Sequence, residues 1–286
     1  MNTIELCGTD KLDIVKTFEC GQCFRWNADE NGVYHGVAGE NPAKVFVNGG
    51  KVYITSEAPE SFWRSYFDMD TDYELAAAGF TGEYLERCRE FGKGIRILRQ
   101  EPWEALCSFI ISQCNNIIRI KGIVERLCES FGKAVRFDGK CCYTFPSADT
   151  VAALGEDDLK VLRCGYRAEY IITAARAVST GELDLQGLKE LDCREAVKEL
   201  RKLKGIGEKV ANCVVLFGLN HTEAFPVDVW MKRALKEHFP PDFDPETLGR
   251  YAGLAQQYIF YYARSGGTGA NAPKNAEMLC GTGIIT

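Results

Sequence analysis

Residues 194–218 read REAVKELRKLKGIGEKVANCVVLFG, and this stretch decides how the chain folds. Apolar residues recur at helical spacing on both sides of the segment KGIG (204–207), which predicts two amphipathic helices joined by a short turn. The two glycines allow a sharp turn and leave the first amides of the second helix pointing outward, where they can bind a phosphate. A plain helical hairpin has the same pattern, so the glycines alone leave both readings open.

The residues after this turn add chemistry to the hairpin. Lys209 opens the second helix, where the positive helix end and neighbouring cations disfavour an ammonium group. A lysine held neutral is a nucleophile near neutral pH. Cys213 lies four residues further on and shares a helix face with Lys209. Asp228 follows the lysine by 19 residues, at the end of the segment FPVD, where it either caps the next helix or supports chemistry at the lysine.

The overall charge of the chain is acidic, but the hairpin is locally basic. The 286 residues carry a formal net charge of −6, with a pI near 5.3, which argues against a protein that coats nucleic acid through bulk charge. From Arg194 to Lys209, however, six basic residues accompany three acidic ones. This local excess indicates either a phosphate-facing surface or an ordinary solvated helix face.

Composition also bounds the class of protein. At 286 residues, 46% of them hydrophobic, the chain is long enough for two lobes or domains. No apolar run approaches the roughly 20 residues of a membrane span, and the first 13 residues lack the features of a signal peptide. The thirteen cysteines are scattered, with Cys20 and Cys23 as the only C-x-x-C pair, so we expect reduced, buried thiols. These features predict a cytosolic protein, or at most a nuclear one.

The residue pattern predicts an α+β fold. Residues 1–100 contain the strand-like segments CFRWNA, VYHGVA, AKVFVNGG and KVYITS, separated by Asn/Gly turns, which predict a twisted antiparallel sheet domain. From SFWRSYF the pattern turns helical, and after Pro102 we expect it to stay helical through residue 264, with the hairpin at about 194–218 and Asp192 as a cap. Residues 265–286 are rich in Gly, Ala and Asn and predict a flexible tail.

Taken together, the G-I-G-x-K segment ending at Lys209, the 19-residue gap and the P-V-D segment ending at Asp228 resemble the helix-hairpin-helix DNA glycosylase superfamily. The resemblance spans about residues 15–262 and is to the 8-oxoguanine DNA glycosylase family, including its N-terminal sheet domain. It implies an enzyme that flips 8-oxoguanine out of duplex DNA. It also implies that Lys209 attacks C1′, that a Schiff base forms, and that β-elimination breaks the strand. Asp228 would stabilise the charge developing on the sugar or hold the lysine in line.

The resemblance implies a base pocket built from two segments. GQCFRW, starting at Gly21, matches the family's G-Q-x-F-R-W segment, in which the glycine carbonyl accepts N7–H of 8-oxoguanine, where guanine has a lone pair. The alternative for Gly21 is a turn glycine. YAGLAQQYIF (251–260) resembles the helix that lines the pocket, with Gln256 on the Watson–Crick edge and with Phe260 and Cys213 on the two faces of the base. Gln256 and Phe260 are four residues apart and share a helix face.

Further segments resemble the parts of the family that contact DNA. SQCNNIIR (112–119), with Asn116 and Arg119, resembles the Asn-rich helix start, and GYRA (165–168) resembles a loop of the family. By this resemblance Tyr166 wedges the duplex, while Arg119 and Arg167 reach the cytosine left behind. The alternative for each arginine is a surface position near phosphate.

The resemblance assigns the hairpin to the DNA backbone. The turn residues would bind phosphates, helped by a monovalent cation, Na⁺ or K⁺, held by backbone carbonyls. The residues implied are Lys204, Gly205 and Gly207 for the phosphates, and Arg201, Leu203 and Ile206 for the cation. No cofactor is expected. Cys280 is the only cysteine after Asp228, so we expect no iron–sulfur cluster.

Three positions depart from the family pattern. Cys114 stands where the best-known members have an asparagine that fills the gap left by the flipped base, which puts the preference for the opposite base in doubt. Trp230 replaces a histidine and would cover a phosphate or support Phe260 by different contacts. Lys204 replaces a proline and adds positive charge.

The expected partner is double-stranded DNA containing 8-oxoguanine, bound by a monomer that contacts no membrane. We expect it in the cytoplasm, associated with the nucleoid in a prokaryote, or in the nucleus of a eukaryote. A related glycosylase for another damaged base is the nearest alternative, but it would not explain Lys209, Gly21 and Gln256 together. A non-catalytic DNA-binding hairpin would leave Lys209, Cys213 and Asp228 without a purpose. A degenerate enzyme is the third alternative.

Overall fold

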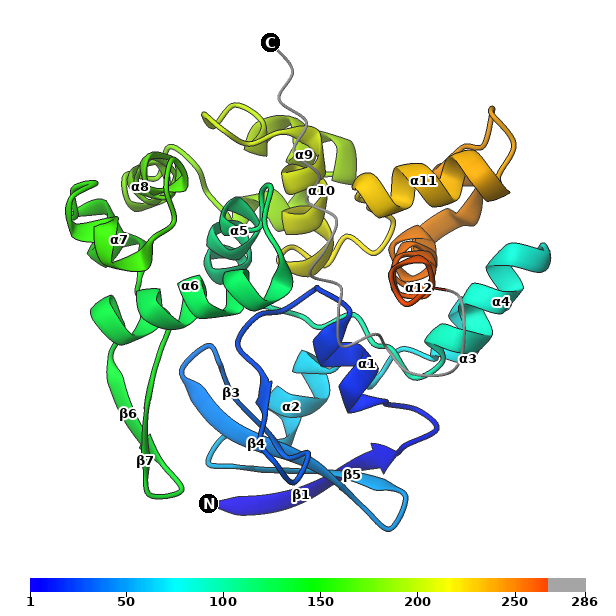
Figure 1. Ribbon diagram of the computed structural model, residues 1–286, viewed down its shortest axis with the longest axis horizontal. Helices are drawn as coiled ribbons and strands as arrows, with labels where there is room; N and C mark the ends of the chain where they lie inside the picture. Colours follow the sequence, from blue (N-terminus) through cyan, green and yellow to red (C-terminus); the bar gives the residue numbers. More distant parts are fainter. Residues whose placement is uncertain (267–286) are drawn as a thin grey trace.

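A five-stranded antiparallel sheet lies beneath a layer of helices in the computed structural model, which describes residues 1–266 (Figure 1). Its strands, in the spatial order β1-β5-β4-β3-β2, are β1 (Asn2–Gly8), β2 (Asn27–Ala28), β3 (Tyr34–Ala38), β4 (Asn41–Asn48) and β5 (Lys51–Ser56). The predicted segments VYHGVA, AKVFVNGG and KVYITS form β3, β4 and β5. The α+β prediction is confirmed.

The sheet buries one face against two short helices, α1 (Ile14–Glu19) and α2 (Glu60–Tyr66). Aromatic side chains fill this core: Phe18 stacks on Trp26 with ring centroids 4.6 Å apart, and Trp63 meets Trp26 edge to face. Burial of such large rings is the main force that holds a small sheet to its covering helices. The sheet therefore forms a firm base for the helical layer.

The helical layer carries most of the predicted site residues. Its α-helices are α3 (Tyr73–Ala76), α4 (Glu83–Gly92), α5 (Pro102–Ile111), α6 (Ile117–Phe131), α7 (Ala148–Ala152), α8 (Arg167–Ser179), α9 (Cys193–Leu200), α10 (Glu208–Phe217), α11 (Val229–His238) and α12 (Ala252–Arg264). Three 3-10 helices connect them: η1 (Asp158–Leu162), η2 (Gly187–Glu190) and η3 (Pro245–Tyr251). As predicted, Asp192 caps α9, since its side chain accepts the Glu195 amide at 2.9 Å.

Two sheet elements were not predicted. The first is β1, which pairs antiparallel with β5 along the edge of the sheet. The second is the hairpin of β6 (Ala134–Phe137) and β7 (Lys140–Tyr143), so the prediction that the chain stays helical after Pro102 is wrong there. An Asp138-Gly139 turn, a strong hairpin signal, lies at its tip. An ion pair of 2.6 Å between Lys44 and Asp138 joins this hairpin to the main sheet.

Packing crosses the predicted domain boundary near residue 100. Helix α4 packs on α12, and its Leu85 and Cys88 are buried in the core of the helical layer. The boundary itself stays a prediction. Residues 267–286, which hold nearly all of the predicted flexible tail, lie outside the described residues. Among residues 1–266, no helix has the length and apolar character to span a membrane. Seven of the twelve cysteines there are buried, as predicted, but Cys114 and Cys141 are exposed.

Candidate active site

The hairpin that opens the site is formed by α9 and α10, joined by residues 201–207. Gly205 has φ +83°, and a Cβ there would lie 2.5 Å from the ring of Tyr170 on α8. Only glycine meets both conditions, the left-handed backbone and the close approach to an aromatic ring. Gly207 occupies the N-cap position of α10 and is exposed. The turn thus presents the N-terminal amides of α10 at the surface.

Lys209, on the first turn of α10, reaches inward to α5. Its Nζ lies 3.3 Å from Ser112 Oγ and 5.5 Å from the centroid of the Phe109 ring. The Ser112 hydroxyl donates to the Phe109 carbonyl at 2.8 Å, so its oxygen is left to accept from the amine. Ser112 and Phe109 therefore orient Lys209, a contact that the sequence did not predict.

Cys213 and Asp228 lie next to this lysine. Burial raises the pKa of the Cys213 thiol; the nearby Lys209 ammonium lowers it, and the Asp228 carboxylate raises it further. Asp228 is the N-cap of α11, where its Oδ1 accepts the Met231 amide at 2.8 Å. The structure thus brings together the lysine, the cysteine and the aspartate singled out in the sequence. It also shows that Asp228 is a helix cap.

Gly21 lies next to the aromatic ring of Phe260. Its φ is +80°, and a Cβ there would lie 3.4 Å from Phe260 and from Ile117. The neighbouring Gln22 fixes this backbone: its side chain donates to the Arg96 carbonyl at 2.8 Å and accepts the Leu98 amide at 2.8 Å. Gln22 is fully buried. It is therefore a positioning residue, one that the GQCFRW segment contained but whose partners could not be read from the sequence.

The helix α12 carries Gln256 and Phe260. Gln256 is buried and its Oε1 accepts from Gln257 Nε2 at 2.7 Å. Phe260 is half-buried, with the Arg264 guanidinium 5.6 Å from its ring centroid. Gly21 and Phe260 thus come together from segments more than 200 residues apart, while the base pocket itself stays a prediction.

Comparison with known proteins accounts for this arrangement. Residues 6–106 match the family model "8-oxoguanine DNA glycosylase, N-terminal domain", and residues 107–249 match "HhH-GPD superfamily base excision DNA repair protein". The N-glycosylase/DNA lyase of Saccharomyces cerevisiae is 30% identical over 272 residues, which cover 84% of this chain and 70% of the yeast protein. The chain belongs to the 8-oxoguanine DNA glycosylase family.

Further relatives agree with this assignment of the glycosylase. The N-glycosylase/DNA lyase OGG1 of Arabidopsis thaliana is 29% identical over 87% of this chain and 77% of its own length. A solved structure of Clostridium acetobutylicum 8-oxoguanine glycosylase/lyase, in complex with double-stranded DNA containing cytosine opposite to 8-oxoG, has a TM-score of 0.84 and 38% identity. That match covers 91% of this chain and 94% of the clostridial one.

The residues that the resemblance assigns to the opposite base are divided between the surface and the interior. Asn116 caps α6 by accepting the Arg119 amide at 2.9 Å, and the Arg119 side chain is exposed. Tyr166 is 54% exposed and meets Tyr170 edge to face at 5.7 Å. Arg167, in contrast, is only 4% exposed. Its guanidinium bonds backbone carbonyls in the interior, which disagrees with the alternative of a surface arginine near phosphate, and its contact with the cytosine stays a prediction.

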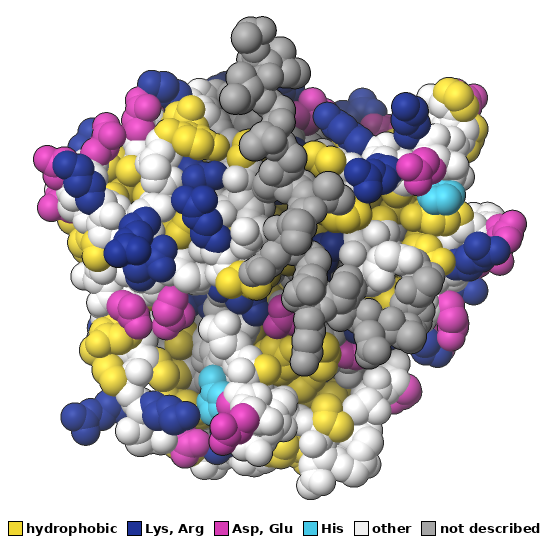
Figure 2. Space-filling view, in the orientation of Figure 1, with side chains coloured by type: hydrophobic (Ala, Val, Ile, Leu, Met, Phe, Trp, Pro, Cys, Tyr) yellow, Lys and Arg dark blue, Asp and Glu magenta, His cyan; other side chains and the backbone are white. Residues whose placement is uncertain are grey.

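Two further residues predicted to contact DNA are engaged within the protein. Lys204 forms an ion pair with Glu169 of α8, and both side chains are exposed. Figure 2 shows basic and acidic side chains interspersed over one face of the glycosylase, in keeping with its net charge. Trp230 lies on α11 with the Arg233 guanidinium 5.4 Å from its ring. The predicted DNA contacts of Lys204 and Trp230 stay predictions.

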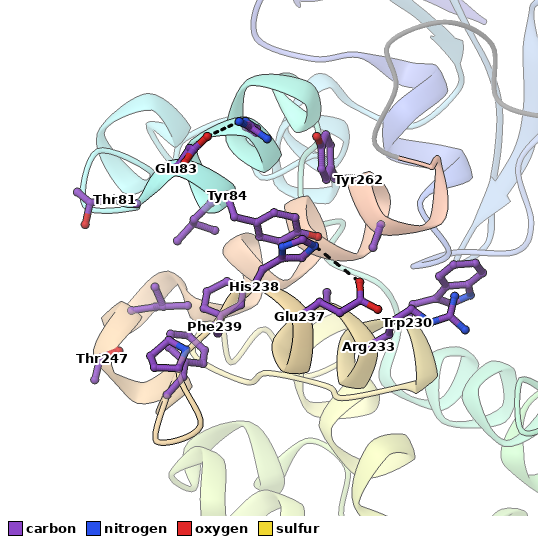
Figure 3. A pocket seen from close by; sticks show the side chains of 18 of the residues that line it. Thr81, Glu83, Tyr84, Trp230, Arg233, Glu237, His238, Phe239, Thr247 and Tyr262 are labelled. Atoms are coloured by element: carbon purple, nitrogen blue, oxygen red, sulfur yellow. Dashed lines mark hydrogen bonds and ion pairs between the residues drawn. The ribbon is translucent and has the colours of Figure 1, made fainter.

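Trp230 and Arg233 also line a cavity of about 1000 Å³ between α4, α11 and α12 (Figure 3). Tyr84 and His238 stack in it with ring centroids 3.8 Å apart. None of the residues that line it is Lys209, Cys213 or Asp228. This cavity is therefore separate from Lys209, and Trp230 is the one predicted site residue on its wall.

Proposed function

We propose that this chain is a DNA N-glycosylase/lyase that removes 8-oxoguanine from double-stranded DNA and then cleaves the strand. The observation that carries the proposal is the position of Lys209, whose amine lies against Ser112 and Phe109 and beside Cys213, the thiol that Asp228 also neighbours. A non-catalytic hairpin needs no half-buried amine at this point. Membership of the 8-oxoguanine DNA glycosylase family supports the same function.

The reaction follows from the chemistry of an amine at the sugar. The neutral amine of Lys209 attacks C1′ as the bond from C1′ to the base breaks, and the base leaves with the electron pair and takes up a proton. The Asp228 carboxylate stabilises the positive charge that develops on the sugar. The C1′–N adduct then opens to a Schiff base. Loss of a proton from C2′ breaks the bond between C3′ and its phosphate oxygen, which completes β-elimination.

Base selection is assigned to the gap between Gly21 and Phe260. The Gly21 carbonyl would accept N7–H of 8-oxoguanine and repel the N7 lone pair of guanine. Phe260 would stack on the flipped base with Cys213 on its other face, and Gln256 would bond its Watson–Crick edge. The left-handed backbone of Gly21, held by the buried Gln22, supports a fixed orientation for that carbonyl.

The hairpin is assigned to the phosphates. The exposed amides at Gly207 and the start of α10 suit an anion, with Gly205 and Lys204 beside them. The carbonyls of Arg201, Leu203 and Ile206 fit Na⁺ or K⁺, which bind backbone oxygens. The Leu203 carbonyl already accepts the Ile206 amide at 3.2 Å and keeps one lone pair for an ion. Such an ion would bridge the turn to a phosphate, and it takes no part in bond breaking.

The proposed function also determines the expected cellular location. We infer that the enzyme acts where the DNA is, in the cytoplasm and nucleoid of a prokaryote or the nucleus of a eukaryote. We also infer that it acts as a monomer, since one chain supplies the lysine, the aspartate and the base pocket.

Covalent trapping tests the proposal. An end-labelled duplex with one 8-oxoguanine opposite cytosine is incubated with the protein and borohydride, then run on a denaturing gel. We expect a slow-migrating adduct that is absent with Lys209→Gln and with undamaged DNA. Lys140→Gln, at the exposed tip of the β6–β7 hairpin, is the matched control and should trap like the parent. Base loss without an adduct would remove the lyase role, and neither product would overturn the function.

A further inference from the structure

Residues 20–25, the Gly21 loop, are closed at both ends by one side chain, that of Lys121 on α6. The Lys121 ammonium donates to the carboxylate of Glu19, the last residue before the loop, at 2.9 Å. It also donates to the carbonyl of Trp26, the first residue after the loop, at 2.9 Å. Only 16% of the Lys121 side chain is exposed, so water screens these contacts little. One ammonium thus links the start of the loop to its end.

A second residue of α6, which lies above the sheet (Figure 1), contacts the same loop. Ile117 is four residues before Lys121 and therefore shares a helix face with it. The Ile117 Cδ1 lies 3.4 Å from the position that a Cβ on Gly21 would occupy. One face of α6 therefore supplies both an apolar contact and an ion pair to the Gly21 loop.

A second cation holds the loop from α12. The Arg264 guanidinium donates to the backbone carbonyl of Glu19 and lies 5.6 Å from the centroid of the Phe260 ring. The Glu19 carboxylate also has a neighbour on β3: burial raises the pKa of the Tyr34 phenol, and this carboxylate raises that pKa further. The residue that begins the loop is thus contacted from α6, α12 and β3.

The orientation of the Gly21 carbonyl depends on such contacts. Under the proposed function this carbonyl attracts the N7–H of 8-oxoguanine and repels the N7 lone pair of guanine, and both effects depend on its direction. Glycine has the widest choice of backbone conformations, so contacts outside the residue must select one of them. Gln22 supplies such contacts from the interior, and Lys121 supplies them from the opposite end of the loop.

Resting on the proposed function, we infer that Lys121 is a positioning residue for lesion recognition, which fixes the Gly21 carbonyl by joining Glu19 to Trp26. Charge-assisted hydrogen bonds are about twice as strong as neutral ones, and loss of this ammonium would release both ends of the loop together. The carbonyl would then lose its fixed direction, and its contact with N7–H would weaken. The turn assigned to the phosphates, residues 201–207, lies on other elements, so the affinity for undamaged DNA should not change.

Binding measurements test the inference without relying on catalysis. In full-length Lys209→Gln protein, fluorescence anisotropy gives Kd for duplexes with 8-oxoguanine, guanine or a tetrahydrofuran site opposite cytosine. We expect 8-oxoguanine to bind at least about 10-fold more tightly than guanine, the value of one hydrogen bond. Adding Lys121→Met should lower this preference by about 5- to 10-fold, through weaker binding of 8-oxoguanine alone. Lys121→Arg keeps charged donors and should retain the preference within about 3-fold.

Two further variants separate positioning from stability. Lys44→Met removes another partly shielded ion pair, that with Asp138, and is the matched control. It should lower Tm as Lys121→Met does and leave the preference for 8-oxoguanine unchanged. Glu19→Gln removes the charge of the partner but keeps its shape, so it should lower the preference by about 2- to 3-fold. This variant tests the inference even if Lys121→Met does not fold.

The outcomes distinguish the inference from the proposed function. An unchanged preference in Lys121→Met or, if that variant does not fold, in Glu19→Gln would overturn the inference alone. Equal weakening of binding to all three duplexes would also overturn it, because a general loss of structure does not select one base. A Lys209→Gln protein that binds 8-oxoguanine no better than guanine would overturn the proposed function, and the inference with it.

Discussion

Two regions of this glycosylase can be compared: the predicted catalytic region around Lys209 and the predicted opposite-base region around Cys114. Each contains the start of a helix capped by a side chain, α11 by Asp228 and α6 by Asn116, but the charged groups of the two regions are used in opposite ways. Around Lys209, the Ser112 hydroxyl and the Cys213 thiol lie next to the amine, and Asp228 lies next to that thiol. Around Cys114, the Arg167 charge is turned inward to hold backbone carbonyls, and Arg119 is left outside. The role of a residue can therefore be predicted from its type where helix spacing determines its neighbours. The prediction is poorer where a long side chain forms hydrogen bonds with backbone carbonyls from a distant segment.

Replacing Asp228 by asparagine tests whether the catalytic side needs charge or only a cap. Asparagine caps helices about as well as aspartate, so Tm should change little. The rate of single-turnover excision should fall by about 10²- to 10³-fold, because the charge developing on the sugar loses its carboxylate.

Asp192→Asn is the matched control, since Asp192 caps α9 with the same geometry and should leave the rate unchanged. If Asp228→Asn excises 8-oxoguanine at nearly the parent rate, Asp228 is a cap and nothing more.

Gly21→Ala sharpens the comparison within the base pocket. The added methyl group would lie 3.4 Å from Phe260 at a backbone φ of +80°, so both the gap and the carbonyl orientation change. We expect excision to slow by about 10²-fold, the effect of a displacement near 1 Å at a reacting site. Gly49→Ala has a similar strain at φ +55° in open space, so it should lower stability to a similar extent with no effect on excision rate. Equal losses of excision rate in Gly21→Ala and Gly49→Ala would indicate that backbone strain, and not a change in base recognition, slows excision.

Alkylation compares the two sides through their cysteines. Cys114 is exposed, whereas Cys213 is buried with its pKa raised by that burial, so less of its thiolate is present at any given pH. Iodoacetamide should modify Cys114 at least about 10-fold faster than Cys213 near neutral pH, and the Cys213 rate should keep rising at pH values where exposed thiols level off.

Peptide mass spectrometry measures both rates in one sample. A duplex with an abasic analogue should protect Cys114 but not the exposed Cys141 of the β6–β7 hairpin. Equal protection of both thiols would contradict a DNA contact at the Cys114 loop.

The smallest effect is expected for Cys114→Asn. Asparagine tolerates the left-handed backbone at this position, so the substitution should stabilise the protein by about 0.5–1 kcal/mol. For a chain of this size that is a rise in Tm of about 1–4 °C. Calorimetry of the variant beside Cys141→Asn, which lies in an ordinary strand, isolates the effect of backbone conformation. A fall in Tm for Cys114→Asn would show that its thiol packs better than its exposure suggests.

The elements predicted from the sequence are those set by local patterns. The hairpin helices, the Asp192 cap and strands β3 to β5 follow from periodicity and turn residues, which act over a few positions. The β1 strand and the β6–β7 hairpin were missed, although an Asp138-Gly139 turn was present. The pairing of β1 depends on β5, a distant segment of the chain. The β6–β7 hairpin is local, but the apolar helical segments on either side of it dominated the pattern.

The candidate site shows the same division. The gathering of Lys209, Cys213 and Asp228 was predictable from helix spacing and the family resemblance. The partners of Arg167 and Lys204 were not, since Gln113 lies 54 residues from the first and Glu169 lies 35 residues from the second. The partners of a long basic side chain are the groups that the tertiary fold brings within its reach, and these partners cannot be deduced from sequence spacing.

Gln100 links the loop that contains Gly21 to helix α10, which carries Lys209. Its side chain donates to the Gln22 carbonyl at 2.7 Å, and its amide donates to the carbonyl of Phe217, at the end of α10, at 3.1 Å. A single residue thus sets the spacing between the Gly21 loop and the helix that carries Lys209. An insertion beside Gln100 would therefore shift the Gly21 loop and α10 relative to each other, and with them the residues to which we assign base recognition and attack on the sugar.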